Sequence, residues 1–129
     1  MATKTEGKHA AEFLVSEANG TLSRETATVK SGQNLVAGEV VEKDVDGKLI
    51  AFSAGVDSDG AVLVEAVGIM WDNVDASATG ANADVPGQVY IARLAEVNDG
   101  EITYPTETSD GGEKALAIAS LEKLHIRPR

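Results

Sequence analysis

Short apolar runs alternate with turn sequences along most of the chain. The runs are rich in β-branched residues, and Gly, Asp and Asn are frequent between them, which is typical of strands joined by tight turns. The spacing predicts about seven short strands, with residues 61–71 forming one strand or a strand pair. The predicted strand segments are 26–30, 35–42, 48–53, 61–71, 88–97 and 101–104.

Glycines and polar segments refine this pattern. Gly38 and Gly68 interrupt two of the strands; Gly38 marks a bulge or close packing, and Gly68 marks a bulge. The small polar residues of 72–84 predict a loop, and Pro86-Gly87 predicts a turn. The side chains expected to point inward from segment 88–97 are Val89, Ile91 and Leu94.

Residues 113–124 are the one good helix candidate. Ser109 or Asp110 can cap its start, and Pro128 prevents its extension. The apolar stripe at helical spacing consists of Leu116, Ile118, Ala119, Leu121 and Leu124. We therefore predict a mainly β fold, a small β-barrel or β-clip-like domain with one C-terminal helix.

The first residues differ from the rest. Residues 1–11 are polar and aperiodic, and the apolar patch Phe13–Val15 stands alone before the turn at Asn19-Gly20. We predict an N-terminal arm over 1–25, disordered in part when the protein is free, followed by a single β-rich domain over 26–129.

The charge is uneven. The 129 residues carry a net charge of −10 and no cysteine. Residues 1–38 are neutral, residues 39–113 carry −13 and residues 114–129 carry +3. This balance argues against a broad nucleic-acid-binding face, and no apolar run approaches the ~18 residues that span a membrane. The basic tail either closes on the acidic body of its own chain or meets an acidic patch on a neighbouring subunit.

The sequence contains little that indicates a catalytic site or a metal site. There is no Gly-x-Ser-x-Gly motif, and the two histidines are His9, in the predicted arm, and His125, at the end of the predicted helix. Asp44-x-Asp46-Gly47 and Asp57-x-Asp59-Gly60 resemble the start of a calcium loop, but neither continues the pattern, and Asp-Gly is ordinary in hairpin turns. We expect no enzyme activity, metal or cofactor.

One set of motifs is more specific. Ser23-Arg24-Glu25 leads into Ser31-Gly32-Gln33 and then Leu35-x-x-Gly38, after the opening run 12–25. In this the chain resembles the head decoration proteins of tailed phages, the lambda-like family, and the resemblance covers essentially the whole chain. It implies a homotrimer at local threefold sites on the outside of the expanded capsid, which stabilises the shell against the pressure of packaged DNA. It also implies the major capsid protein as partner, and a location on the virion after assembly in the host cytoplasm.

The resemblance and the residues together nominate contact sites. An extended segment can add a strand to a sheet edge, so the expected capsid-binding residues are Glu12, Phe13, Leu14, Val15, Ser16 and Arg24. The alternative is that Phe13–Val15 packs on its own core as a first strand. Arg24 is either a surface partner of Glu25 or an anchor for the root of the arm. The expected trimer-interface residues are Trp71, Leu121, Leu124 and Arg127. For Trp71, Leu121 and Leu124 the alternative location is the core of their own chain. For Arg127, in the basic tail, the alternative is an ion pair with the acidic body of its own chain.

A second function class remains open at this point. Residues 31–40 also resemble the entry into a lipoyl or β-clip carrier domain or small-molecule module. Such a carrier needs a modifiable lysine at a hairpin tip, and Lys48 lies near a turn. The flanking residues usual around a carrier lysine are missing.

Overall fold

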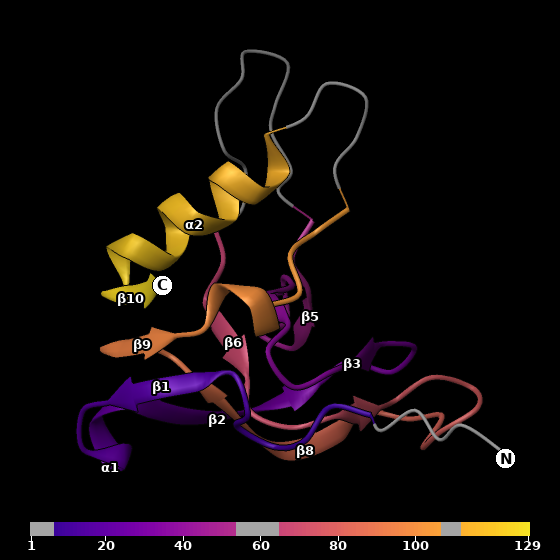
Figure 1. The fold of residues 1–129 in the computed structure, drawn as a ribbon. Coiled ribbons are helices and arrows are strands. Elements are labelled where there is room, and N and C mark those ends of the chain that lie inside the picture. The colour runs from indigo at the N-terminus through magenta and orange to yellow at the C-terminus, as the bar shows by residue number, and fades with distance from the viewer. Residues whose placement is uncertain (1–6, 54–64, 107–111) are drawn as a thin grey trace, which may run out of the picture.

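The structure, a computed structural model, describes residues 7–53, 65–106 and 112–129 (Figure 1). This part of the chain is mainly β and ends in a helix followed by a short strand. Its elements are β1 Leu14–Glu17, α1 Gly20–Ser23, β2 Arg24–Val29, β3 Asn34–Leu35, β4 Val40–Lys43, β5 Leu49–Ala51, β6 Gly68–Met70, β7 Val74–Asp75, β8 Val85–Ile91, β9 Ala95–Val97, the 3₁₀ turn η1 Asp99–Glu101, α2 Glu113–Lys123 and β10 Ile126–Pro128. The predicted fold class is confirmed.

Five strands close into a barrel in the order β2-β5-β4-β6-β8, with β8 returning to β2. A three-stranded sheet, β1-β9-β10, lies beside the barrel, and α2 packs near β10 above it (Figure 1). In this sheet β9 is central, antiparallel to β1 and parallel to β10.

Alternation along the barrel strands builds two cores. Successive side chains of a strand point to opposite faces. Val40, Ile69 and Ile91 therefore pack in one cluster with the small sheet and α2, while their neighbours Val41, Met70 and Tyr90 pack in the other. Because these strands are buried on both faces, they appear in the sequence as continuous apolar runs.

Both interrupting glycines lie where another backbone comes close. A Cβ on Gly38 would lie 2.6 Å from the carbonyl oxygen of Glu101, and Gly38 has a φ of 87°. A Cβ on Gly68 would lie 2.1 Å from the carbonyl oxygen of Ile91. The predicted segment 35–42 accordingly divides at Gly38 into β3 and β4.

Several local predictions are wrong. The predicted loop 72–84 contains β7, which pairs with β3, and Pro86-Gly87 lies inside β8 rather than in a turn. Segment 88–97 is not one strand, because the chain turns a corner at Leu94, whose φ is 55° and whose side chain points outward. In segment 101–104 the structure has the end of η1 and an isolated bridge from Thr103 to Glu39.

The C-terminal helix is confirmed with small changes. It spans Glu113–Lys123, and its N-cap residue is Gly112, which offers no side-chain cap. The capping prediction is therefore corrected, and Ser109 and Asp110 themselves lie outside the described residues, as do residues 61–64 and the Asp57–Gly60 turn. Strand β10, which follows the helix, is an addition to the prediction.

Candidate functional site

The N-terminal segment crosses the side of the body before it enters β1. The Lys8 ammonium donates to the Glu101 carbonyl at 3.1 Å and to the Thr103 hydroxyl at 2.9 Å. The Ala11 amide donates to the Trp71 carbonyl at 2.9 Å, and the Asn98 amide to the Phe13 carbonyl at 2.7 Å. This segment is thus held by two separate parts of the chain, around Trp71 and around η1.

Phe13 and Val15 face opposite environments. Phe13 is fully buried in the cluster beneath the small sheet, and its Cβ lies next to Gly38. Leu14 is half-buried against the same cluster, whereas Val15 is 56% exposed. Phe13 and Val15 therefore do not share one contact face, and in this conformation the Phe13–Val15 patch packs on its own core.

Of the expected capsid-binding residues, Glu12, Val15 and Ser16 face outward. Glu12 lies 3.4 Å from the His9 ring, and the Ser16 hydroxyl donates to Glu96 across the sheet at 3.2 Å. Since β9 lies between β1 and β10, β1 forms an edge of its sheet. Edge strands are where an extended partner segment can pair.

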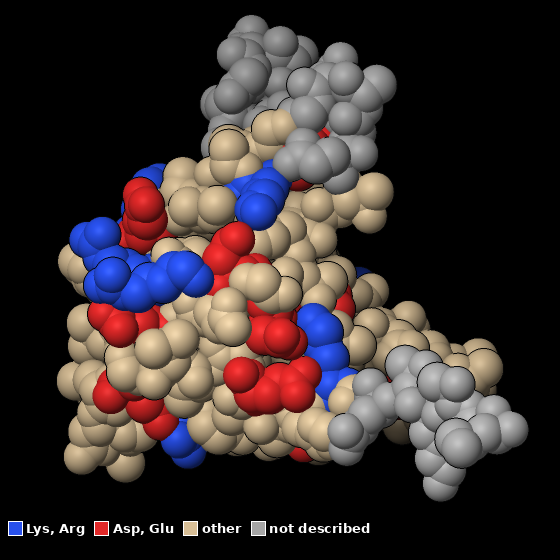
Figure 2. Space-filling model, viewed as in Figure 1, with Lys and Arg blue, Asp and Glu red and all other residues tan. Residues whose placement is uncertain are grey.

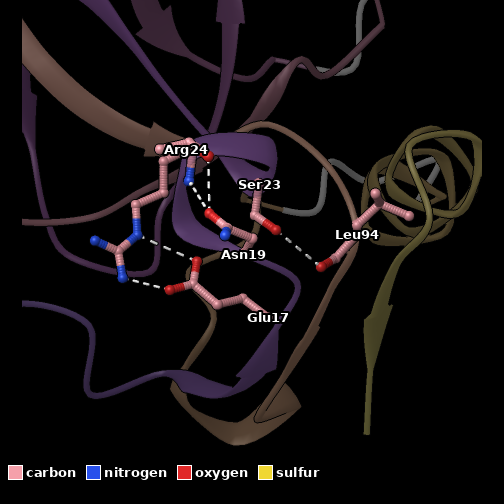
Figure 3. A network of polar contacts seen from close by, with 6 residues as sticks. Glu17, Asn19, Ser23, Arg24 and Leu94 are labelled. Atoms are coloured by element: carbon pink, nitrogen blue, oxygen red, sulfur yellow. Dashed lines mark hydrogen bonds and ion pairs between the residues drawn. The ribbon is translucent and has the colours of Figure 1, made fainter.

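Arg24 connects the end of β1 to the barrel. Its guanidinium donates from Nε to Glu17 Oε2 at 3.1 Å and from Nη2 to Glu17 Oε1 (Figure 3). The same group lies over the Trp71 ring, 3.9 Å from the centroid. The sequence suggested Glu25 as the alternative partner, but Glu25 pairs with Arg93 and accepts from the Tyr90 hydroxyl. Arg24 therefore anchors the root of the N-terminal segment to the body of its own chain.

The corner between β1 and β2 is closed by local caps. Asn19 Oδ1 accepts from the Thr21 amide at 3.0 Å and so caps α1. The buried Ser23 hydroxyl donates to the Leu94 carbonyl at 3.2 Å, which ties α1 to the corner before β9 (Figure 3). Asn19-Gly20, predicted as a turn, lies where the chain passes from β1 in the three-stranded sheet to β2 in the barrel.

The four expected trimer-interface residues lie in different environments. Leu121 is fully buried in the core, so it has no surface to offer a partner in this conformation. Trp71 and Leu124 are half-buried against the same core cluster. Arg127 is exposed on β10 and lines a shallow depression that Ser16 also lines.

The basic tail mostly closes on its own chain. Lys114 pairs with Asp99 at 3.6 Å, Arg129 pairs with Glu96 at 2.8 Å, and Lys123 pairs with Glu65. Figure 2 shows blue side chains gathered where α2 and β10 end, beside red side chains over the middle of the same face. Arg127 is the base of this tail that makes no ion pair with any described residue.

The Asp44–Gly47 segment and Lys48, which the sequence offered as a calcium loop and a carrier lysine, form a turn and an ion pair. Asp44 Oδ1 accepts from the amides of Asp46 and Lys48 at 2.9 Å each, as in a hairpin turn. The Lys48 ammonium pairs with Asp84 at 2.8 Å, which also holds the Asp84 carboxyl pKa below its usual value. Among the described residues no group of three or more His, Cys, Asp or Glu is placed to hold a metal ion.

Comparison with known families supplies the deciding observation. The sequence model described as bacteriophage lambda head decoration protein D matches residues 3–126 of the 129-residue chain. The chain belongs to this family. A search of curated proteins found no match to this chain. The head decoration family is one of structural capsid proteins rather than enzymes, so this member is a capsid protein of a phage virion that binds the shell.

The match also places the structural elements within the family. It includes the N-terminal segment, both cores, α2 and the start of β10. No helix in the described part of the chain is long and apolar enough to cross a membrane.

Some residues of this surface did not stand out in the sequence. Glu17 was not singled out, although it is the partner of Arg24 seven residues on. Leu22, which was not singled out either, is 49% exposed, and Leu94, which was expected to point inward, is 36% exposed. The Asn19-Gly20 turn was the one available signal, since a reversal there brings Glu17 and Arg24 together.

Proposed function

We propose that this head decoration protein binds as a homotrimer at local threefold sites on the outside of the expanded phage head. There it holds neighbouring capsomers together against the internal pressure of the DNA. The observation that carries the proposal is the family match over nearly the whole chain. The protein is made in the host cytoplasm and joins the shell once the shell has expanded.

The N-terminal segment is the part of the protein that binds the capsid shell. Glu12, Val15 and Ser16 are exposed, on or next to an edge strand. Phe13 and Leu14 fasten this segment to the core, and Arg24 fixes its root. Three such segments on one trimer bind together, so weak single contacts add up to tight attachment.

The distribution of charge supports an outer location. The body of the chain, residues 39–113, carries −13, which repels nucleic acid. An acidic decoration protein on the outside of a DNA-filled shell does not compete for the packaged genome. Within the trimer, half-buried Trp71 and Leu124 and exposed Arg127 are the residues we expect near neighbouring copies.

A single substitution tests the gripping segment more cleanly than a deletion. Removing residues 1–16 also removes Phe13 from the core, which costs about 3–5 kcal/mol for a buried aromatic side chain. Val15→Asp instead changes an exposed side chain, and Val45→Asp is its control, because Val45 is fully exposed in the distant 44–47 turn. We expect both variants to melt like the wild type and only Val15→Asp to bind expanded heads more weakly. Equal binding by the two variants contradicts the assignment of the segment.

A further inference from the structure

One corner of the molecule combines backbone strain with exposed apolar side chains. Leu94 has a φ of 55°, a left-handed conformation that leucine seldom adopts, and His125 has a φ of 59° directly after the C-cap of α2, where helices commonly end in this conformation. The two residues adjoin, because the Leu94 amide donates to the Leu124 carbonyl at 3.1 Å and the Ala95 amide to the His125 carbonyl at 3.2 Å. Strain that a fold retains tends to lie at functional positions.

Leu94 and His125 line a shared depression. It has a volume of about 400 Å³ and lies on the outer side of the β1-β9-β10 sheet. Its lining consists of Ser16, Glu17, Ala18, Leu94, Ala95, Glu96, His125 and Arg127. Leu22 belongs to the same corner, since its carbonyl accepts from Arg93 and the next residue, Ser23, donates to Leu94.

The charges of the depression leave one group unmatched. Glu17 is paired with Arg24, and Glu96 is paired with Arg129. Arg127 has no such partner among the described residues, although the chain has an excess of ten negative charges. A second copy of the same chain is therefore an abundant source of the carboxylate that Arg127 lacks.

We propose that the corner surface formed by Leu22, Leu94, His125 and Arg127 is a docking site for a second copy of this chain, which places a carboxylate on Arg127 and apolar atoms on the two leucines. The contact joins two different patches, so it is heterologous, and three copies close a ring through it. This inference rests on the proposed self-association and names the surface that makes it.

Zero-length cross-linking tests the contact on heads and in solution. Arg127→Lys keeps the positive charge and allows a carbodiimide to join residue 127 to a touching carboxylate. Val45→Lys is the control at a fully exposed position in the turn between β4 and β5. Peptide mapping of heads decorated with each variant should find links from position 127 to acidic residues of another decoration chain, and no such links from position 45. Links from position 127 only to the capsid protein, or no links from it between decoration chains, overturn the inference.

A second variant separates docking from folding. Leu94→Asn suits a left-handed backbone, so the substituted chain should melt at the wild-type temperature or above. Its binding to heads should nevertheless lose cooperativity between copies, with at least about a tenfold weaker contact between them. Unchanged cooperativity contradicts the proposal. If the wild-type protein binds no heads at all, the proposed function fails, and cross-linking of Arg127→Lys in concentrated solution still decides the docking site.

Discussion

The guanidinium carbon of Arg24 lies 3.9 Å from the centroid of the Trp71 ring. A Cβ on Gly20 would lie 3.5 Å from that carbon, at ordinary van der Waals distance, so the start of α1 passes close to the group. With Glu17 binding two of its nitrogens, Arg24 joins the end of β1, the start of β2 and the residue after β6. The segment assigned to the capsid contact is thereby fixed to the barrel at one point.

Replacing Arg24 should weaken this attachment and lower the stability of the fold. We expect Arg24→Ala to lower the free energy of unfolding by about 1–2 kcal/mol, because the ring contact and the partly exposed ion pair each contribute up to about 1 kcal/mol. Arg24→Lys should restore less than half, since an ammonium cannot reproduce the planar stack and the two-point contact. Urea denaturation measures both values.

Arg93→Lys serves as a matched control for this prediction. Arg93 is about as exposed as Arg24 (36% against 39%), and its partner Glu25 is more exposed than Glu17 (45% against 15%). Substitution of Arg93 should therefore cost less than that of Arg24, which also stacks on Trp71. A wild-type unfolding free energy for Arg24→Lys would show that Arg24 does not hold the segment.

Gly38 should tolerate no side chain. In Gly38→Ala the new methyl group would meet the Glu101 carbonyl at 2.6 Å, in addition to the cost of a positive φ. Gly47→Ala isolates the second term, because Gly47 has a φ of 80° and open space around it. We expect a loss of about 1 kcal/mol for Gly47→Ala and at least about 2 kcal/mol more for Gly38→Ala. Equal losses, measured by thermal unfolding, would contradict the close approach.

Two glutamates should affect the stability of the fold at neutral pH in opposite directions, and both effects should fade in acid. Burial raises the pKa of the Glu39 carboxyl above 4.5, so the folded chain binds this proton more tightly than the unfolded chain does. Its charged form therefore destabilises the fold at neutral pH, and the effect fades as pH falls through the raised pKa toward 4.5. Glu39→Gln should melt at a higher temperature than the wild type at pH 7, and this difference should shrink on acidification.

Glu25 provides the opposite case. The hydrogen bond from Arg93 holds the pKa of the Glu25 carboxyl below 4.5, so its stabilising effect is complete above pH 4.5 and is lost as pH falls through the lowered value. Glu25→Gln should melt at a lower temperature than the wild type at pH 7, with a difference that disappears in acid. Melting curves from pH 3 to 7 that move in the same direction for both variants would contradict this account.

Patterns of side-chain type predicted the barrel well. The strands β4, β6 and β8 carry apolar residues on both faces, and the turn at Asp44–Gly47 has the Asp-Gly sequence of a tight hairpin. Close packing at Gly38 was one of the two predicted interpretations and is confirmed, whereas Gly68, predicted to mark a bulge, also lies at a close approach. These features are local, so each could be recognised from a few neighbouring residues.

Features that depend on distant partners were missed. Strand β7 forms from a polar segment because β3, which lies much earlier in the chain, offers it hydrogen bonds. The left-handed conformation at Leu94 is a compromise between two sheets that no local preference of leucine indicates. For the N-terminal segment, the sequence left arm and first strand both open, and in this structure residues 14–17 pair with β9.

The site predictions divided in the same way. Glu12, Val15 and Ser16 are exposed as a contact surface requires, whereas Phe13 and Leu121 lie in the core. Exposure on a short strand with a bulge could not be derived from alternation, because the register of β1 shifts between Leu14 and Ser16.

The most direct measurement counts the copies of the protein that bind to purified expanded and unexpanded heads of its phage. The account predicts saturable binding to expanded heads in multiples of three copies at the local threefold sites, and no binding to unexpanded heads. Binding to neither form, or equal binding to both, would contradict it.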